Sequence, residues 1–102
     1  MTEIDTKVAL LQALMESDSY GLGLIDRVRD ATCGRIVMMQ GSVYPALREL
    51  ESAGLLESYD GDPLPERGGR PRRYYRITAE GRRLAREQAH ALLGLFKPAV
   101  MP

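Results

Sequence analysis

Residues 66–78 read ERGGRPRRYYRIT, and this stretch decides the expected fold. It holds five arginines beside a glycine pair and one proline, and no acid follows its first residue. Its second half, residues 73–77, is rich in aromatic and branched side chains, which favour a strand. Residues 55–59 have the pattern of a second strand. Residues 60–71 are therefore expected to join the two strands as a long, basic hairpin.

The arginines of this hairpin predict an anionic partner. Like charges that no nearby acid neutralises repel one another, and the glycines let a phosphate approach the backbone closely. The alternative is a solvated run of charge in a flexible loop. Strand alternation is expected to put Arg72, Tyr74 and Arg76 on one face and Arg73, Tyr75 and Ile77 on the other. The two tyrosines are expected to pack this strand onto the core.

Three helices are expected before the hairpin, because apolar side chains recur with helical spacing between turn residues. They cover residues 2–17, 22–32 and 42–53. Thr2 or Asp5 is expected to cap the first helix, and residues 17–21 form a turn after it. The short apolar run at residues 36–39 is expected to be a connector or a strand stub.

The third helix and a fourth, last helix carry clear end signals. Ser42 is expected to cap the third helix, Pro45 to lie in its first turn, and Gly54 to end it in the left-handed conformation. The last helix, residues 79–96, is expected to follow Thr78 as its cap.

The element order is therefore helix, helix, helix, strand, strand, helix. This order predicts an α+β, mainly α, fold class with a winged helix-turn-helix architecture, in which one helix enters the major groove of DNA and the hairpin contacts the backbone or minor groove. A chain of 102 residues suffices for one hydrophobic core. Residues 1–78 are expected to form the winged helix-turn-helix DNA-binding domain, and residues 79–102 a C-terminal dimerisation helix of the same compact unit.

The formal net charge of zero hides two opposed halves. Residues 1–66 hold five basic and twelve acidic side chains, while residues 67–102 hold nine basic and two acidic ones. The balance is about −7 in the first part and about +7 in the second. The second part can therefore hold a polyanion despite overall neutrality.

The third helix offers the surface expected to read DNA bases. Arg48 is its best base reader, because a guanidinium can bind guanine through two hydrogen bonds. The hydroxyls of Ser42 and Tyr44 suit phosphate. Glu49 and Glu51 weaken this interpretation. The alternative is a solvated helix face on which the arginine pairs with a glutamate.

Two segments resemble one known family. Residues 41–58 read GSVYPALRELESAGLLES, and residues 68–84 read GGRPRRYYRITAEGRRL. Both are similar to recurring segments of the PadR family of bacterial winged-helix transcription regulators, and the single helix expected after the hairpin resembles the short subgroup of that family. The resemblance implies sequence-specific DNA binding by a homodimer, a palindromic operator, and repression more often than activation.

The resemblance also implies roles for individual residues. The implied DNA contacts lie in the third helix and the hairpin, at Ser42, Tyr44, Pro45, Arg48, Arg70, Arg72 and Arg73. A dimer surface is expected on the first and last helices, at Val8, Leu11, Leu84, Gln88, Leu92, Leu95 and Phe96. The alternative is that the last helix only covers the core of one chain. A long amphipathic helix has more apolar face than such a core needs, which favours dimerisation.

Other classes of protein fit the sequence less well. No apolar run is long enough to cross a membrane and the N-terminal stretch lacks a signal-peptide pattern, so the expected compartment is the cytoplasm. The sequence has no nucleophile, phosphate-loop or metal-binding pattern, so neither an enzyme nor a cofactor or metal site is expected. Cys33, near a helix end, is expected to be a partly buried thiol.

Two alternatives to a simple DNA-binding regulator stay open. The acidic first part of the chain could bind a basic protein, which would make the winged helix an interaction module that does not bind DNA specifically. The regulator could also respond to a small-molecule effector or a metal ion. Cys33 and His90 are the only soft metal ligands, and the sequence names no effector pocket.

Overall fold

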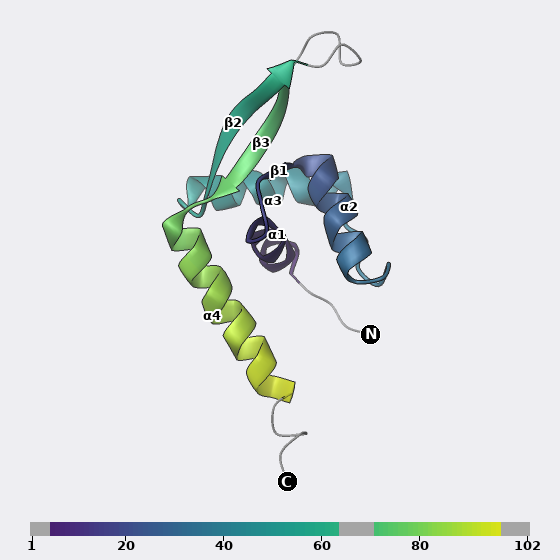
Figure 1. Ribbon diagram of the computed structural model, residues 1–102, viewed down its shortest axis with the longest axis vertical. Helices are drawn as coiled ribbons and strands as arrows, with labels where there is room; N and C mark the ends of the chain where they lie inside the picture. Colours follow the sequence, from purple (N-terminus) through teal and green to yellow (C-terminus); the bar gives the residue numbers. More distant parts are fainter. Residues whose placement is uncertain (1–4, 64–70, 97–102) are drawn as a thin grey trace.

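Figure 1 shows the chain as a computed structural model, which describes residues 5–63 and 71–96. Its elements are, in order, α1 (Thr6–Leu14), β1 (Ser19–Tyr20), α2 (Gly21–Ala31), α3 (Gln40–Ser52), β2 (Leu56–Pro63), β3 (Pro71–Ile77) and α4 (Ala79–Phe96). The strands β2 and β3 project from the helices as a two-stranded ribbon (Figure 1), which we call the wing. The predicted fold class, α+β and mainly α, is confirmed.

The wing is longer than the sequence predicts. Pairing of β2 with β3 begins at Leu56 and continues, across an irregularity after Asp60, to the pair formed by Pro63 and Pro71. The expected strand at residues 55–59 therefore covers only the base of β2. Proline and glycine made the outer part resemble a loop, yet the edge of a two-stranded ribbon tolerates both.

The strand β1 was not predicted, because residues 17–21 have the sequence pattern of a turn. Ser19 and Tyr20 pair antiparallel with Tyr75 and Tyr74 of β3, and the sheet order is β1-β3-β2. A strand of two residues has no periodicity of its own. It gains its hydrogen bonds only because β3, more than fifty residues later, lies beside it.

The start of α3 differs from the prediction. The helix begins at Gln40, with Met39 as its N-cap, and the amides of Ser42 and Val43 both donate to the Met39 carbonyl at 2.9 Å. Ser42 is therefore inside the helix, and the prediction that it caps α3 is wrong. Pro45 lies beyond the first turn for the same reason. The carbonyl that loses its helical partner to Pro45 belongs to exposed Gly41, where water can replace the missing amide.

Three other helix ends follow the sequence. Asp5 caps α1 by accepting the Lys7 amide at 2.7 Å, although the helix ends at Leu14, earlier than predicted. Gly54 ends α3 with a φ of 80°, which suits glycine. Thr78 caps α4, because its hydroxyl oxygen accepts the Gly81 amide at 3.0 Å.

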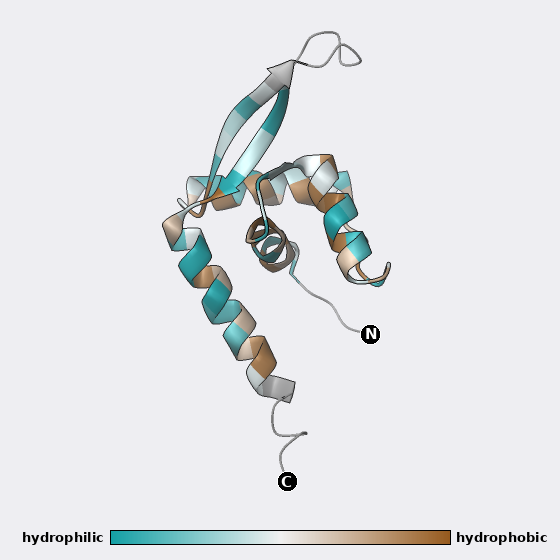
Figure 2. Cartoon of the chain, viewed as in Figure 1, coloured by the Kyte–Doolittle hydropathy of each residue, from teal (hydrophilic) through white to brown (hydrophobic). Residues whose placement is uncertain are grey.

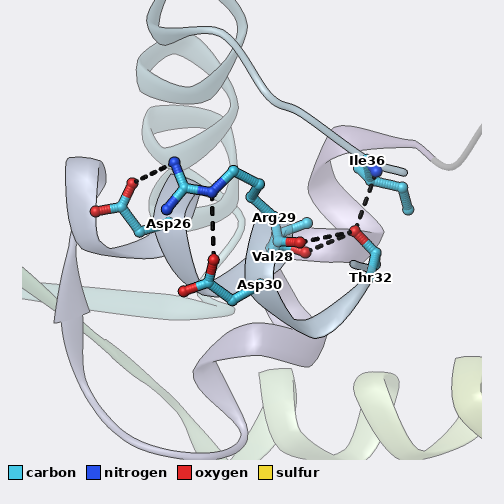
Figure 3. A network of polar contacts seen from close by, with 6 residues as sticks. All are labelled: Asp26, Val28, Arg29, Asp30, Thr32 and Ile36. Atoms are coloured by element: carbon cyan, nitrogen blue, oxygen red, sulfur yellow. Dashed lines mark hydrogen bonds and ion pairs between the residues drawn. The ribbon is translucent and has the colours of Figure 1, made fainter. Parts of the chain in front are cut away.

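The connection between α2 and α3 is held by Thr32 (Figure 3). Its hydroxyl donates to the Val28 carbonyl at 2.8 Å and accepts the Ile36 amide at 3.0 Å, so the last turn of α2 is tied to the connector. Cys33 follows with a φ of 55° and is exposed, so the prediction of a partly buried thiol is wrong. The left-handed turn points its side chain away from the packed helices. Residues 36–39 form a connector, which was one of the two expected structures.

The core forms where α1 lies between the other helices and the base of the sheet. Its largest fully buried side chains come from α1, α2 and α3, and they are Leu10, Leu11, Leu14, Leu24, Val43 and Leu47. Tyr75 and Ile77 add the inner face of β3. Leu11 is only 1% exposed, so its expected place on a dimer surface is wrong. It faces the core of its own chain, where no second chain can reach it.

Candidate nucleic-acid interface

The outer face of α3 is exposed along its whole length. Its apolar face is buried, while Ser42, Pro45, Arg48 and Ser52 are exposed. Pro45, Arg48 and Ser52 line a shallow open groove together with Glu49 and Ala53. Three of the four DNA contacts predicted on α3, which are Ser42, Pro45 and Arg48, are therefore exposed to solvent.

Arg48 is available for a ligand. Its neighbour Glu49 accepts a 2.8 Å hydrogen bond from the Lys7 ammonium of α1, and Glu51 accepts one of 2.7 Å from the Ser58 hydroxyl. Among the residues that the structure describes, no hydrogen bond or ion pair engages Arg48. The alternative of an arginine–glutamate pair on this face is therefore not what the structure shows.

Tyr44, the fourth predicted contact of α3, is half-buried. A Cβ atom added at Gly21 would lie 2.6 Å from the Tyr44 ring and hydroxyl, so this ring packs against the first residue of α2. Only glycine leaves room for it. Tyr44 therefore fixes α3 against α2, and its contact with phosphate stays a prediction.

The arginines of β3 lie on two faces of the wing, as alternation predicts. Arg72 lies over the ring of Tyr20, with its guanidinium carbon 4.3 Å from the ring centroid. Arg73, on the other face, donates to the Ser58 hydroxyl at 3.0 Å. Arg76 donates to Glu57 at 2.9 Å, which neutralises it. Arg70 lies outside the described residues.

The two tyrosines of β3 pack in different places. Tyr75 is 7% exposed and belongs to the core. Tyr74 packs between the rings of Tyr20 and Tyr59. The expected packing onto the core therefore holds for Tyr75, whereas Tyr74 lies within the sheet between two other rings.

The Tyr75 hydroxyl lies where charges of α3 and the wing converge. Burial is the main cause that raises the pKa of Tyr75, and the negative charge of Glu51 adds to it. The positive charges of Arg73 and Arg48 act in the opposite direction. The wing and α3 are joined by hydrogen bonds through Ser58, which accepts one from Arg73 at 3.0 Å and donates one to Glu51 at 2.7 Å.

Two residues of the expected dimer surface, one on α1 and one on α4, lie beside the same pocket. Val8 of α1 and Leu92 of α4 line one largely apolar pocket of about 270 Å³, which also extends along α2. Leu92 is 41% exposed and its neighbour Leu93 is 68% exposed. Figure 2 shows hydrophobic segments alternating with hydrophilic ones along α4.

The other expected dimer residues divide into two groups. Leu84 is half-buried and packs against the core, and the Gln88 Oε1 atom is buried without a hydrogen-bond partner in the described structure. The side chains of Leu95 and Phe96 lie outside the described residues. The apolar pocket beside Val8 and Leu92 could not be predicted from the sequence, because its residues come from elements far apart in the chain. The same is true of the packing of Tyr74 between Tyr20 and Tyr59.

Membrane-spanning helices and metal clusters are both absent from the described residues. In that part of the chain, no helix has both the length and the apolar character needed to cross a bilayer. Over the same ranges, no group of three or more His, Cys, Asp or Glu side chains is arranged to hold a metal ion.

Three helices followed by an antiparallel wing define the winged-helix class. The chain is similar to a transcriptional regulator from Clostridium thermocellum, with a TM-score of 0.75 and 29% identity over 93% of this chain and 85% of that one. It is also similar to a PadR family transcriptional regulator from Eggerthella lenta, with a TM-score of 0.66 and 34% identity over 95% and 82% of the two chains.

The sequence comparisons identify the family. Residues 10–87 match the family described as Transcriptional regulator PadR-like, so the chain belongs to that family. Its members are transcription regulators and not enzymes, as predicted from the sequence. A curated relative from Lysinibacillus sphaericus, Uncharacterized protein X, is 30% identical over 73 residues, and the match covers 72% of this chain and 64% of that protein.

Proposed function

We propose that the chain binds double-stranded DNA as a sequence-specific transcription regulator, with α3 as the recognition helix. The observation that carries this proposal is the exposed guanidinium of Arg48 on α3, beside a wing that carries Arg72 and Arg73. A guanidinium on an exposed helix can bind guanine in the major groove, and the wing arginines can bind phosphates. Ser42 and Pro45 flank Arg48 on the same exposed surface. Arg70 is proposed as a further wing contact from the sequence alone.

A homodimer is the second part of the proposal. Val8 and Leu92 share an apolar pocket, and Leu93 next to it is largely exposed, so a second copy packed against α1 and α4 would remove this surface from water. In this arrangement residues 1–78 bind DNA and the last helix joins the copies. Two recognition helices related by a two-fold axis match a palindromic operator. A dimer that occupies a promoter excludes other proteins from it, so we propose repression.

Binding to DNA can be tested by fluorescence anisotropy at increasing salt concentration. The probes are a labelled duplex that covers the promoter region beside the protein's own gene and a random duplex of equal length. We expect preference for the promoter duplex and a steep loss of affinity as salt rises, because arginine–phosphate contacts release counterions. The variant that carries Arg70→Ala, Arg72→Ala and Arg73→Ala is expected to bind both duplexes weakly.

Two controls separate this proposal from a protein-interaction module. Arg29→Ala removes an arginine already held by Asp26 and Asp30 at 3.3 and 3.2 Å, and it is expected to leave DNA binding unchanged. Light scattering is expected to give the mass of two chains. Full DNA binding by the triple variant, or no binding of either duplex at low salt, contradicts the proposal. The acidic first part of the chain would then be the better candidate for a binding surface.

A further inference from the structure

Three tyrosines form a row across the sheet and connect the wing to α2. Tyr20, Tyr74 and Tyr59 occupy paired positions on β1, β3 and β2. The ring centroids of Tyr20 and Tyr74 are 5.5 Å apart in an edge-to-face arrangement, and those of Tyr74 and Tyr59 are 5.8 Å apart and stacked. Tyr20 is the residue directly before α2, so the row ends where the helices begin.

An arginine lies at each end of this row, and the two differ in what their N–H groups contact. Arg76 lies over Tyr59, with its guanidinium carbon 5.0 Å from the ring centroid, and donates to Glu57 through two nitrogens. Arg72 lies over Tyr20 at 4.3 Å, and in the described residues no acceptor binds its N–H groups. A guanidinium that stacks through its face keeps its N–H edge free, and this edge fits a phosphate.

The ring under Arg72 is fixed relative to the recognition helix. Tyr20 is held by its pairing with β3, and the next residue, Gly21, packs against Tyr44 of α3. A side chain that rests on such a ring has fewer conformations to lose when it binds a ligand. Arg72 is therefore oriented before DNA arrives, at a set position with respect to Arg48.

We propose that Tyr20 is a positioning residue for DNA binding, whose ring holds the Arg72 guanidinium so that its N–H edge binds a phosphate of the DNA backbone. This inference rests on the proposed function. It assigns to β1, which the sequence did not reveal, a role in binding beyond completing the sheet. A purely structural row would stabilise the wing without any link between Tyr20 and the strength of the Arg72 contact.

The test measures the affinity for a random duplex across a series of KCl concentrations, because a phosphate contact acts on every sequence. Arg72→Ala is expected to weaken binding about three- to tenfold and to reduce the salt slope by about 0.9, the value for one lost phosphate contact. Tyr20→Leu is expected to reproduce most of both changes. Tyr20→Phe keeps the ring and is expected to bind like the unchanged protein.

A double-variant cycle shows whether the two residues act together. Adding Tyr20→Leu to Arg72→Ala is expected to cause no further loss, because the arginine that the ring holds is already absent. The matched control combines Arg76→Gln with Glu57→Gln, which removes the other stacked arginine without changing the net charge. It is expected to leave the salt slope unchanged.

A second variant keeps the inference testable if thermal melting shows that Tyr20→Leu does not fold. Arg72→Lys preserves the charge but lacks the flat, forked guanidinium, so it is expected to bind more weakly than the unchanged protein. Equal binding by Arg72→Lys, or additive losses in the double variant, overturns the inference. If Arg73→Ala and Arg48→Ala weaken binding while Tyr20→Leu does not, only this inference fails. If the unchanged protein binds no DNA, the proposed function fails with it.

Discussion

The ammonium group of Lys7 on α1 donates a 2.8 Å hydrogen bond to Glu49 on α3, next to the predicted base-reading Arg48. This hydrogen bond is the main cause that raises the pKa of Lys7, and the charge of Glu49 adds to it. Both side chains are exposed, so the contact contributes little to stability. Its consequence is electrostatic, because the positive charge of Lys7 offsets the negative charge of Glu49 close to the proposed DNA contact.

Lys7→Ala is therefore expected to weaken DNA binding without changing the melting temperature much. The freed Glu49 carboxylate would repel phosphates and attract Arg48. Glu49→Gln added to Lys7→Ala is expected to restore binding, because it removes the carboxylate charge. Anisotropy with the promoter duplex at low salt measures both variants. If the double variant binds as weakly as Lys7→Ala alone, Lys7 contacts DNA itself and does not act through Glu49.

Arg48→Ala is expected to reduce the preference for the promoter duplex over a random one. A guanidinium that binds guanine through two hydrogen bonds contributes about 1–3 kcal/mol of discrimination between bases. The measurement is the ratio of the two dissociation constants. Ser52→Ala, on the same exposed face near the end of α3, is the control and is expected to keep the ratio. An equal loss of affinity for both duplexes would show that Arg48 binds phosphate and not a base.

Leu11 and Leu92 are expected to respond differently to substitution. Leu11 is 1% exposed, so Leu11→Ala is expected to cost about 2–5 kcal/mol in free energy of unfolding, measured by urea denaturation. Leu92 is 41% exposed at the pocket between the helices, so Leu92→Gln is expected to keep the fold of one chain and to favour monomers in light scattering. A dimer of unchanged strength in Leu92→Gln would move the dimer surface elsewhere.

The elements with local signals could be predicted from the sequence. Gly54 and Thr78 mark helix ends through their own conformation and hydroxyl group, and the alternation along β3 follows from strand geometry. The contact between Lys7 and Glu49 beside Arg48 could not be predicted, because the two residues lie more than forty positions apart in the chain. From the sequence, a pair between Arg48 and a glutamate stayed open as the alternative to base reading.

The errors have a common physical cause, which is that tertiary contacts overrode local preferences. Ser42 is a good cap, yet α3 starts at Gln40, because the Met39 carbonyl already accepts the amides of Ser42 and Val43. Leu11 belongs to a helix that is apolar on most of its sides, and neighbouring elements surround it. A helical pattern alone cannot show how many sides are covered. β1 exists only through β3.

Gly81 and Gly41 form a matched pair for testing the packing of α4. A Cβ atom at Gly81 would overlap the Leu55 carbonyl oxygen and approach the Ile77 side chain at 2.9 Å, whereas a Cβ at Gly41 meets nothing within 4 Å. Gly81→Ala is therefore expected to lower the melting temperature, because backbone cannot move aside easily. Gly41→Ala is expected to be neutral or to stabilise by up to about 1 kcal/mol through helix propensity. A stable Gly81→Ala variant would contradict the close approach of α4 to the residue before β2.

Tyr59 donates its hydroxyl to Asp18 at 2.6 Å, and this hydrogen bond is the main cause that raises its pKa above the usual 10.0. The folded protein therefore holds the phenolic proton more tightly than the unfolded chain does. The resulting stabilisation is complete below about pH 10 and is lost as the pH rises through the raised pKa of the folded state.

A near-ultraviolet titration of the tyrosines is expected to lose one late ionisation in Tyr59→Phe. The late ionisation of Tyr75, whose pKa is raised by burial, is expected to remain. Asp18→Asn is expected to shift the Tyr59 ionisation to lower pH, because it removes the carboxylate that holds the proton. If neither variant changes the titration, the hydrogen bond between Tyr59 and Asp18 does not form in solution. The wing is then not linked to the turn before β1 through this contact.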